Sequence, residues 1–151
     1  MREEGFIPFI LYTERIAKNI KRIEDSVMEP YGLRSSHVMC ILRISEHEGG
    51  LSSAALSSAC GVDKAFISRI TSELTDKEYI KKGSEHAYKT KFVLTEKGKD
   101  INDIINEAIS SAIKTITKDI PADKMKTFYD VLSTLDDGIA DILKKESDYG
   151  N

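Results

Sequence analysis

The sequence of 151 residues contains no tryptophan, two cysteines and three prolines. Two cysteines are too few for a disulfide framework, and so few prolines permit long uninterrupted helices. No apolar run approaches the ~20 residues that cross a bilayer, which excludes a membrane-spanning segment. The short apolar stretch 6–12 follows Glu3 and Glu4, an order that does not suit a signal peptide. We therefore expect a cytoplasmic protein with no membrane partner.

Sequence patterns typical of enzymes are also missing. The histidines His37, His47 and His86 stand in separate predicted elements, and His47 lacks the second histidine of the helical zinc-protease motif. The chain has no Cys-x-x-Cys pair, no glycine loop that cradles phosphate and no nucleophile elbow. We expect no enzymatic activity, no metal and no cofactor.

The chain does contain two short predicted helices that meet at Gly61. This glycine suits the left-handed backbone between two helices, and Asp63 can cap the N–H groups that open the second helix. Lys64, Ser68 and Arg69 face away from the expected core of the pair. That core consists of Leu56, Cys60, Val62, Ile67 and Ile70. A helix presented in this way is typical of a helix-turn-helix that enters the DNA major groove.

A basic β-hairpin is predicted after these helices. Residues 79–82 and 88–94 have strand character, and residues 83–87 form the predicted turn. A very short strand at Leu51 can pair with this hairpin. Helix, turn, helix and hairpin is the element order of a winged helix. We expect a mainly α fold with a small β-hairpin wing (α+β), in which residues 33–96 form the winged helix-turn-helix DNA-binding lobe.

Charge is unevenly divided along the chain, although the net charge is only −3. Residues 61–99 hold nine Lys or Arg and six Asp or Glu, a local charge of +3, whereas residues 100–151 sum to −5. Screening limits electrostatic reach to about 8–10 Å at physiological salt, so the local charge decides whether phosphate is attracted. The positive segment coincides with the predicted second helix and wing.

Long amphipathic helices are predicted at both ends of the chain, over residues 5–28, over 97–118 and after Pro121. A small winged helix cannot cover all of their apolar faces, which favours burial against a second copy over an intramolecular bundle. Residues 1–32 and 97–151 are the expected helical dimerisation region of one continuous fold. A two-fold homodimer would read a pseudo-palindromic operator of roughly 16–20 base pairs.

Several short segments carry a family resemblance. They are Tyr31-Gly32-Leu33, residues 56–61, residues 62–70 with the pattern Asp-Lys-x-x-x-Ser-Arg, Leu74, Tyr79-Ile80, and residues 93–98, Val-Leu-Thr-Glu-Lys-Gly. Through them the chain resembles MarR-family transcriptional regulators over nearly its full length. The resemblance implies a dimeric winged-helix repressor that binds double-stranded DNA and is released by a small ligand or an oxidant. The alternative is a winged-helix module that binds protein without specific DNA binding, for which the acidic total charge leaves room.

The resemblance implies base contacts from the N-terminal half of the second helix of the pair. The corresponding residues are Lys64, Ala65, Phe66, Ser68 and Arg69. Lys64 and Arg69 suit phosphate or guanine acceptors. Phe66 can meet a thymine methyl or can pack inward, and the sequence leaves both open. Ser52 and Ser53, at a helix start, can offer hydroxyl and backbone N–H groups to phosphate.

The wing departs from the family pattern. Members often carry Asp-x-Arg there, with the arginine in the minor groove, but these positions hold His86 and Tyr88 in this chain. Lys89 and Lys91 are left as contacts to the DNA backbone. His86 is a further candidate contact, and its binding would strengthen as the pH falls toward 6 because histidine titrates near 6.5.

An effector site is implied as well, because similar proteins bind ligands between the dimer helices and the DNA-binding lobe. Residues able to line such a cleft are Tyr12, Arg15, Ile16, His37, Met39 and Cys40, and the alternative for each is ordinary packing between helices. We expect Cys40 and Cys60 to pack as small hydrophobic residues. Redox sensing by Cys40 is the alternative.

Overall fold

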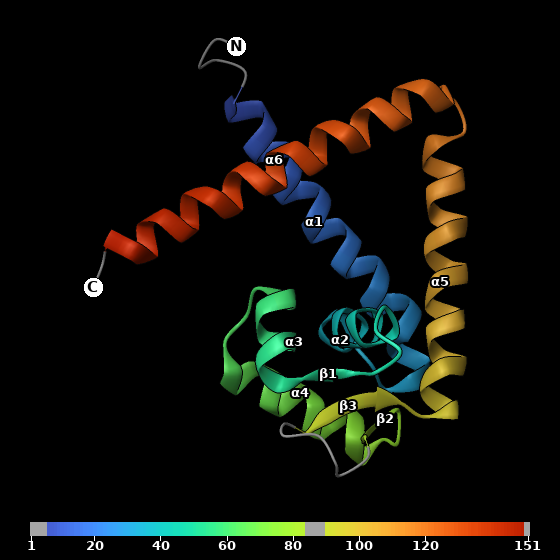
Figure 1. The fold of residues 1–151 in the computed structure, drawn as a ribbon. Helices are drawn as coiled ribbons and strands as arrows, with labels where there is room; N and C mark the ends of the chain where they lie inside the picture. Colours follow the sequence, from blue (N-terminus) through green and yellow to red (C-terminus); the bar gives the residue numbers. More distant parts are fainter. Residues whose placement is uncertain (1–5, 84–89, 150–151) are drawn as a thin grey trace. The chain divides into compact units, whose positions relative to one another are not determined.

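The computed structural model of this chain describes residues 6–83 and 90–149, the last four of them by backbone alone (Figure 1). The chain divides into two units, Met1–Ile109 and Ser110–Asn151. In the first unit the elements are α1 (Phe6–Met28), the 3₁₀ helix η2 (Glu29–Tyr31), α2 (Ser35–Ser45), β1 (Leu51–Ser52), α3 (Ser53–Cys60), α4 (Lys64–Asp76), β2 (Ile80–Lys82) and β3 (Lys91–Leu94). Helix α5 (Glu96–Thr117) begins in the first unit and ends in the second, which also contains α6 (Ala122–Tyr149).

Helix α2 is held at both ends by local hydrogen bonds. Its first residue, Ser35, donates its backbone N–H to Oδ1 of Asp25 on α1 at 2.7 Å. The helix ends at Ser45, and a turn follows in which the N–H of Gly50 donates to the carbonyl of His47. Gly50 has a φ of +71°, and a β-carbon there would overlap the carbonyl oxygen of Phe92.

The sheet is antiparallel, with β3 between β1 and β2 (Figure 1). Leu51 pairs with Phe92, which confirms the very short strand expected before α3. Tyr79 was expected in the first wing strand but lies just outside β2, because its N–H bonds the carbonyl of Leu74 at the end of α4. The second wing strand is described from Lys91 onward, and residues 84–89 lie outside the described part of the chain.

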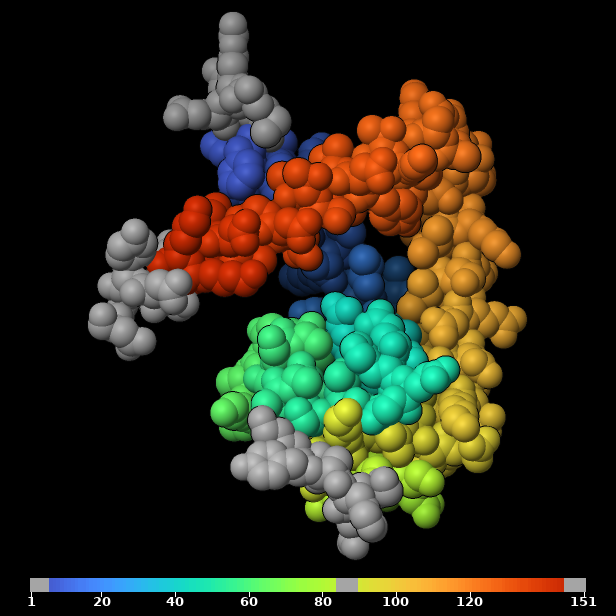
Figure 2. Space-filling model, viewed as in Figure 1, coloured from blue at the N-terminus to red at the C-terminus, as the bar shows by residue number. Residues whose placement is uncertain are grey.

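The hydrophobic core lies in the first unit, and Figure 2 shows side chains filling the space between α2 and α3. Its buried members are Met28, Leu33, Val38, Cys40, Ile41, Ile44, Leu51, Leu56, Ile67, Ile70, Leu74, Tyr79, Ile80, Phe92, Ile101 and Ile105. Leu56, Ile67 and Ile70 are therefore confirmed as core residues. Cys60 and Val62 are only half-buried, because they flank the turn at the rim of the core.

Helix α5 starts at a close junction with the wing. The Oγ1 of Thr95 accepts the N–H of Gly98 at 3.0 Å and donates to the carbonyl of Glu78 at 2.6 Å. Gly98 is buried, and a β-carbon there would overlap the carbonyl oxygen of Tyr79. The Leu-Thr-x-x-Gly pattern of the sequence thus encodes a helix cap and a backbone contact.

In the second unit, α6 begins at Ala122, directly after Pro121. The proline stands before the helix, as expected, and its carbonyl accepts the N–H of Met125 at 3.1 Å. No side chain of α6 from Ala122 to Lys145 is buried. None of the helices in the described residues is both long and apolar enough to cross a membrane.

Candidate nucleic-acid interface

The turn between α3 and α4 is fixed by local hydrogen bonds. Gly61 has a φ of +63°, the left-handed conformation expected from the sequence. Ser57 binds Val62 twice, because its carbonyl accepts the N–H of Val62 and its hydroxyl donates to the carbonyl of the same residue. Oδ1 of Asp63 accepts the N–H of Phe66 at 2.7 Å, which confirms the expected cap. These bonds determine the angle at which α4 leaves α3.

Helix α4 separates its residues into a core face and an exposed face. Ile67, Ile70 and Leu74 are buried, whereas the side chains expected to contact DNA are mostly exposed, namely Lys64, Ala65, Ser68 and Arg69. Within the described residues, neither Lys64 nor Arg69 lies within 4.0 Å of an acidic group. The helix therefore carries two cations with no ion-pair partner in this part of the chain.

Phe66 packs inward and also contacts Arg69. Its side chain is half-buried against the core, and the guanidinium carbon of Arg69 lies 5.1 Å from the centre of its ring. Of the two roles left open by the sequence, the geometry favours packing. Phe66 and Arg69 are three positions apart, and residues with this spacing are neighbours on a helix surface. The sequence therefore already contained a signal for their stacking contact.

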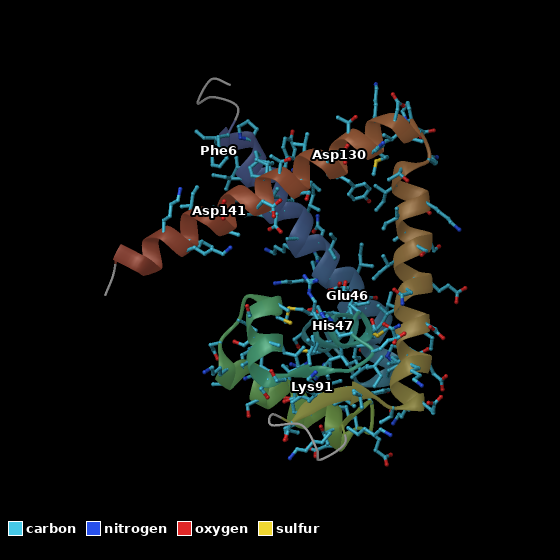
Figure 3. The ribbon with its side chains drawn as sticks, viewed as in Figure 1. Phe6, Glu46, His47, Lys91, Asp130 and Asp141 are labelled. Atoms are coloured by element: carbon cyan, nitrogen blue, oxygen red, sulfur yellow. The ribbon has the colours of Figure 1, made fainter. Side chains whose placement is uncertain are left out.

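The start of α3 lies beside the wing. Ser52 caps this helix, since its Oγ accepts the N–H of Ala55 at 3.2 Å. Ser52 also pairs with Lys91 across β1 and β3, and the exposed Lys91 is labelled in Figure 3. The structure thus brings together the expected phosphate contacts Ser52, Ser53 and Lys91, although they are about 40 positions apart in the sequence.

The wing contributes two further lysines that the sequence analysis missed. Lys81 and Lys82 are exposed on β2 and, as consecutive strand residues, point to opposite faces of the sheet. The sequence did contain a signal for these two side chains, because consecutive lysines stand directly before the predicted turn. The expected contacts His86 and Lys89 lie outside the described residues.

Two other lysines of the positive segment have partners within the chain. Nζ of Lys97 donates to the carbonyl of Lys77 at 2.8 Å and lies 4.6 Å from the centre of the Tyr79 ring. Lys99 pairs with Glu96 at 2.7 Å. These contacts hold the side chains of Lys97 and Lys99 at the start of α5, whereas the exposed cations of α4 and of the wing strands are Lys64, Arg69, Lys81, Lys82 and Lys91.

The residues expected to line an effector cleft fall into two groups. Tyr12, Arg15 and Ile16 are exposed on α1, and Ile16 precedes Met28, the buried end of that helix, by about 18 Å at 1.5 Å per residue. The other group lies on α2 and consists of His37 and Cys40, both buried, and the half-buried Met39. A single chain does not show the two groups lining one cavity, so this site stays a prediction.

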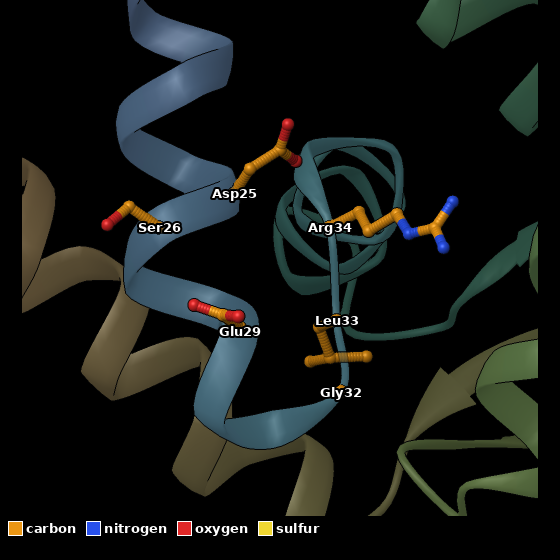
Figure 4. Close-up of a pocket in the computed structure, with 6 residues that line it drawn as sticks. All are labelled: Asp25, Ser26, Glu29, Gly32, Leu33 and Arg34. Carbon is orange, nitrogen blue, oxygen red and sulfur yellow. The ribbon is translucent and has the colours of Figure 1, made fainter.

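A hollow lies elsewhere in the first unit (Figure 4). It is lined by Asp25, Ser26, Glu29, Gly32, Leu33 and Arg34, none of which was expected to bind an effector. Asp25 points toward the start of α2, in keeping with its hydrogen bond to Ser35. In the described parts of the chain, no three His, Cys, Asp or Glu side chains cluster in a way that suits a metal ion.

His37 is only 3% exposed, and both of its ring nitrogens are hydrogen-bonded inside the fold. Nδ1 accepts the backbone N–H of Arg34 at 2.9 Å, and Nε2 lies 2.8 Å from Oε2 of Glu73 on α4. Glu73 is 36 positions further along the chain. No sequence signal linked the two residues.

Both cysteine thiols lie in surroundings that disfavour the thiolate. Burial raises the pKa of the Cys40 thiol to about 12, and it also raises the pKa of the Cys60 thiol. Because thiolates are the reactive form, both cysteines are poor nucleophiles at neutral pH.

Comparison with solved structures relates this geometry to known proteins. The structure of Staphylococcus aureus MarR in complex with salicylate and kanamycin has a TM-score of 0.81 at 14% sequence identity, covering 92% of this chain and 95% of that one. A MarR transcriptional regulator from Methanosarcina mazei has a TM-score of 0.78 at 20% identity, covering 94% of each chain. A MarR/EmrR family regulator from Acinetobacter has a TM-score of 0.78 at 17% identity, covering 93% of this chain and 99% of that one.

No protein-family model matches the sequence, and no curated protein matches it significantly. The similarity to solved structures nevertheless extends over almost the whole chain and includes both the helix-turn-helix and the wing. This chain therefore has the winged-helix fold of the MarR-family transcriptional regulators.

Proposed function

We propose that this chain is a transcriptional regulator of the MarR type that binds specific double-stranded DNA as a homodimer. The observation that carries the proposal is the exposed face of α4, where Lys64, Ser68 and Arg69 project from a helix whose start is capped by Asp63. A fixed helix whose two cations have no ion-pair partner among the described residues suits a major groove lined by phosphates and base acceptors.

Each exposed residue of α4 has a distinct role in this proposal. Arg69 and Lys64 bind guanine acceptors or phosphates, and a well-formed bidentate contact to guanine contributes about 1–3 kcal/mol of discrimination. Ser68 bonds a phosphate or a base edge, and Ala65 offers a methyl group to thymine. Ser52, Ser53 and Lys91 bind the backbone beside the groove, which positions the helix without reading sequence.

Apolar side chains that a single chain leaves exposed support the homodimer. On α1 they include Phe6, Ile7, Leu11, Ile16 and Ile20, and on α6 they include Phe128, Tyr129, Ile139, Ile142 and Leu143. Exposed apolar faces of this extent mark interaction surfaces, and closed two-fold pairing with an identical copy is the commonest way to bury them. Such a dimer would read an inverted repeat.

We further propose that the protein is a repressor released by a small ligand. The Staphylococcus aureus neighbour is in complex with salicylate and kanamycin, which supports a ligand as the signal. The raised pKa values of Cys40 and Cys60 favour a ligand over thiol oxidation. A ligand that lowers DNA affinity 100-fold must favour the non-binding state by about 2.7 kcal/mol.

The proposal can be tested by selecting bound fragments from genomic DNA and titrating the selected site with salt. Affinity should fall steeply as salt rises, because phosphate-bound cations are released. Lys64→Ala with Arg69→Ala should abolish specific binding, whereas Lys118→Ala, which removes an exposed cation outside the first unit, should not. If the double variant still binds the selected site, the interface is wrongly assigned. Absence of salt-dependent DNA binding by the unaltered protein would favour a protein-binding module.

A further inference from the structure

The tautomer of His37 follows from its hydrogen bonds. The backbone N–H of Arg34 can only donate, so Nδ1 of His37 must accept, at 2.9 Å. Nε2 therefore carries the hydrogen of the neutral ring and donates it to the Glu73 carboxylate at 2.8 Å. The imidazole accepts the backbone N–H of Arg34, the N-cap residue of α2, with one nitrogen and binds a side chain of α4 with the other.

Glu73 follows Arg69 by four positions on α4. Residues with this spacing are neighbours on a helix surface, where a carboxylate and a guanidinium can form an ion pair. Glu73 is accessible enough for such a pair, since 43% of its side chain is exposed. Yet its carboxylate binds His37, and the guanidinium of Arg69 lies over Phe66 instead.

We propose that His37 is a positioning residue that keeps the carboxylate of Glu73 away from Arg69, so that the guanidinium stays available for DNA. The inference rests on the DNA-binding function proposed above. Without the imidazole, Glu73 loses its partner on α2 and pairs with Arg69. The pairing neutralises a cation of the interface and moves a negative charge toward the phosphates, so both effects weaken DNA binding.

A simpler role for His37 would be to support the start of α2 alone. The two roles differ in what they predict for a second substitution, Glu73→Gln, which removes the competing charge but restores no contact at the start of α2. If His37 acts through Glu73, loss of the histidine is harmless to DNA binding once residue 73 is neutral. If His37 acts only as a cap, the loss is equally damaging in both backgrounds.

The experiment measures affinity for the selected DNA site, at one salt concentration, for His37→Ala in the wild-type and in the Glu73→Gln background. We expect a loss of about fivefold or more in the first background, the low end for one arginine–base contact, and of less than about twofold in the second. In an Arg69→Ala background, His37→Ala should likewise have little further effect. His47→Ala, an exposed histidine just beyond the same helix, is the matched control and should bind like wild type.

Folding is checked separately, because His37 is buried. If His37→Ala does not melt cooperatively, His37→Leu takes its place, because leucine fills more of the buried space and offers no donor to Glu73, with the same expectation of rescue by Glu73→Gln. Independently of any variant, the ring nitrogen chemical shifts of wild-type His37 should report the Nε2–H tautomer.

Three results would overturn the inference: equal losses in the two backgrounds, no loss in either, or an Nδ1–H tautomer. If wild type binds DNA and the losses are equal, only this inference fails. If wild type binds no DNA, the proposed function fails and the inference fails with it.

Discussion

The guanidinium of Arg69 lies over the ring of Phe66, 5.1 Å from its centre, on the exposed side of α4. A cation over an aromatic face gains about 0.5–1 kcal/mol at an exposed site and loses side-chain freedom in advance of binding. Phe66→Leu keeps an apolar side chain but removes the ring, so we expect a two- to fivefold loss of DNA affinity. Fluorescence anisotropy with a labelled duplex measures it.

Phe66→Tyr keeps the aromatic face and is the control, with near wild-type affinity expected. Thermal melts should place all three proteins within a few degrees of one another. If the leucine variant binds as tightly as the tyrosine variant, the ring does not orient Arg69.

Gly98→Ala should lower the free energy of unfolding by about 1–3 kcal/mol, the usual cost of overpacking, because its β-carbon would overlap the carbonyl oxygen of Tyr79. Urea denaturation gives the value. Gly138→Ala is the matched control, since nothing lies within 4 Å of its β-carbon in α6. The control should raise stability by about 0.5–1 kcal/mol, the propensity of alanine over glycine in a helix.

Glu78→Gly should stabilise the protein by about 1 kcal/mol, because Glu78 has a φ of +62°, a left-handed conformation that is costly for any residue with a β-carbon. Glu78→Ala separates this backbone effect from loss of the charge and should leave stability nearly unchanged. The same urea titration applies. A glycine variant no more stable than the alanine variant would contradict the prediction.

Alkylation of the thiols should be slow at neutral pH and should accelerate as the pH rises. Burial raises both thiol pKa values, so less thiolate is present at any given pH than in a free cysteine. Cys60, which is half-buried, should react before Cys40, whose pKa is about 12. Mass spectrometry after iodoacetamide treatment from pH 7 to 10, with Cys60→Ser as reference, identifies the modified residue. Rapid labelling of Cys40 in the folded protein at pH 7 would contradict the prediction and favour redox sensing by this cysteine.

Ile139→Glu should weaken the proposed homodimer by about tenfold or more, because it would bury an unpaired charge in an apolar interface. Ile139 is 46% exposed in the single chain, so the substitution costs the monomer little. Sedimentation across a concentration series gives the dissociation constant. Asp137→Asn, on the same helix, is the control. If the variant has the same dissociation constant as wild type, Ile139 does not lie in the dimer interface.

Features that depend on neighbouring residues in the sequence were predicted correctly. Asp63 caps the helix that begins at the next residue by accepting an N–H three positions away. Gly61 needs only its own backbone angle, and Leu51 was predicted as a short strand because a hairpin that can pair with it follows. The fold class followed from the order of such elements. Side chains on the exposed face of α4 followed from helical periodicity.

Contacts between segments that lie far apart in the sequence were not predicted. His37 and Glu73 are 36 positions apart, and no periodicity within α2 or α4 relates them. Residue 98 must be glycine because the carbonyl of Tyr79 lies beside it, and that contact is not encoded in the sequence around Gly98. The residues expected to line an effector cleft belong to this class too, since the cleft that the resemblance implies lies between dimer helices and the DNA-binding lobe, a geometry that the sequence alone does not determine.

The pairing of Ser52 with Lys91 makes the wing and the start of α3 parts of one sheet. A substitution that displaces β3 must also displace the serine that caps α3. Compensating changes for a damaged wing should therefore arise at the beginning of α3 in a genetic suppressor screen, far away in the gene. Selection on strand β3 therefore also acts on the start of α3, and we expect the two regions to change together in evolution.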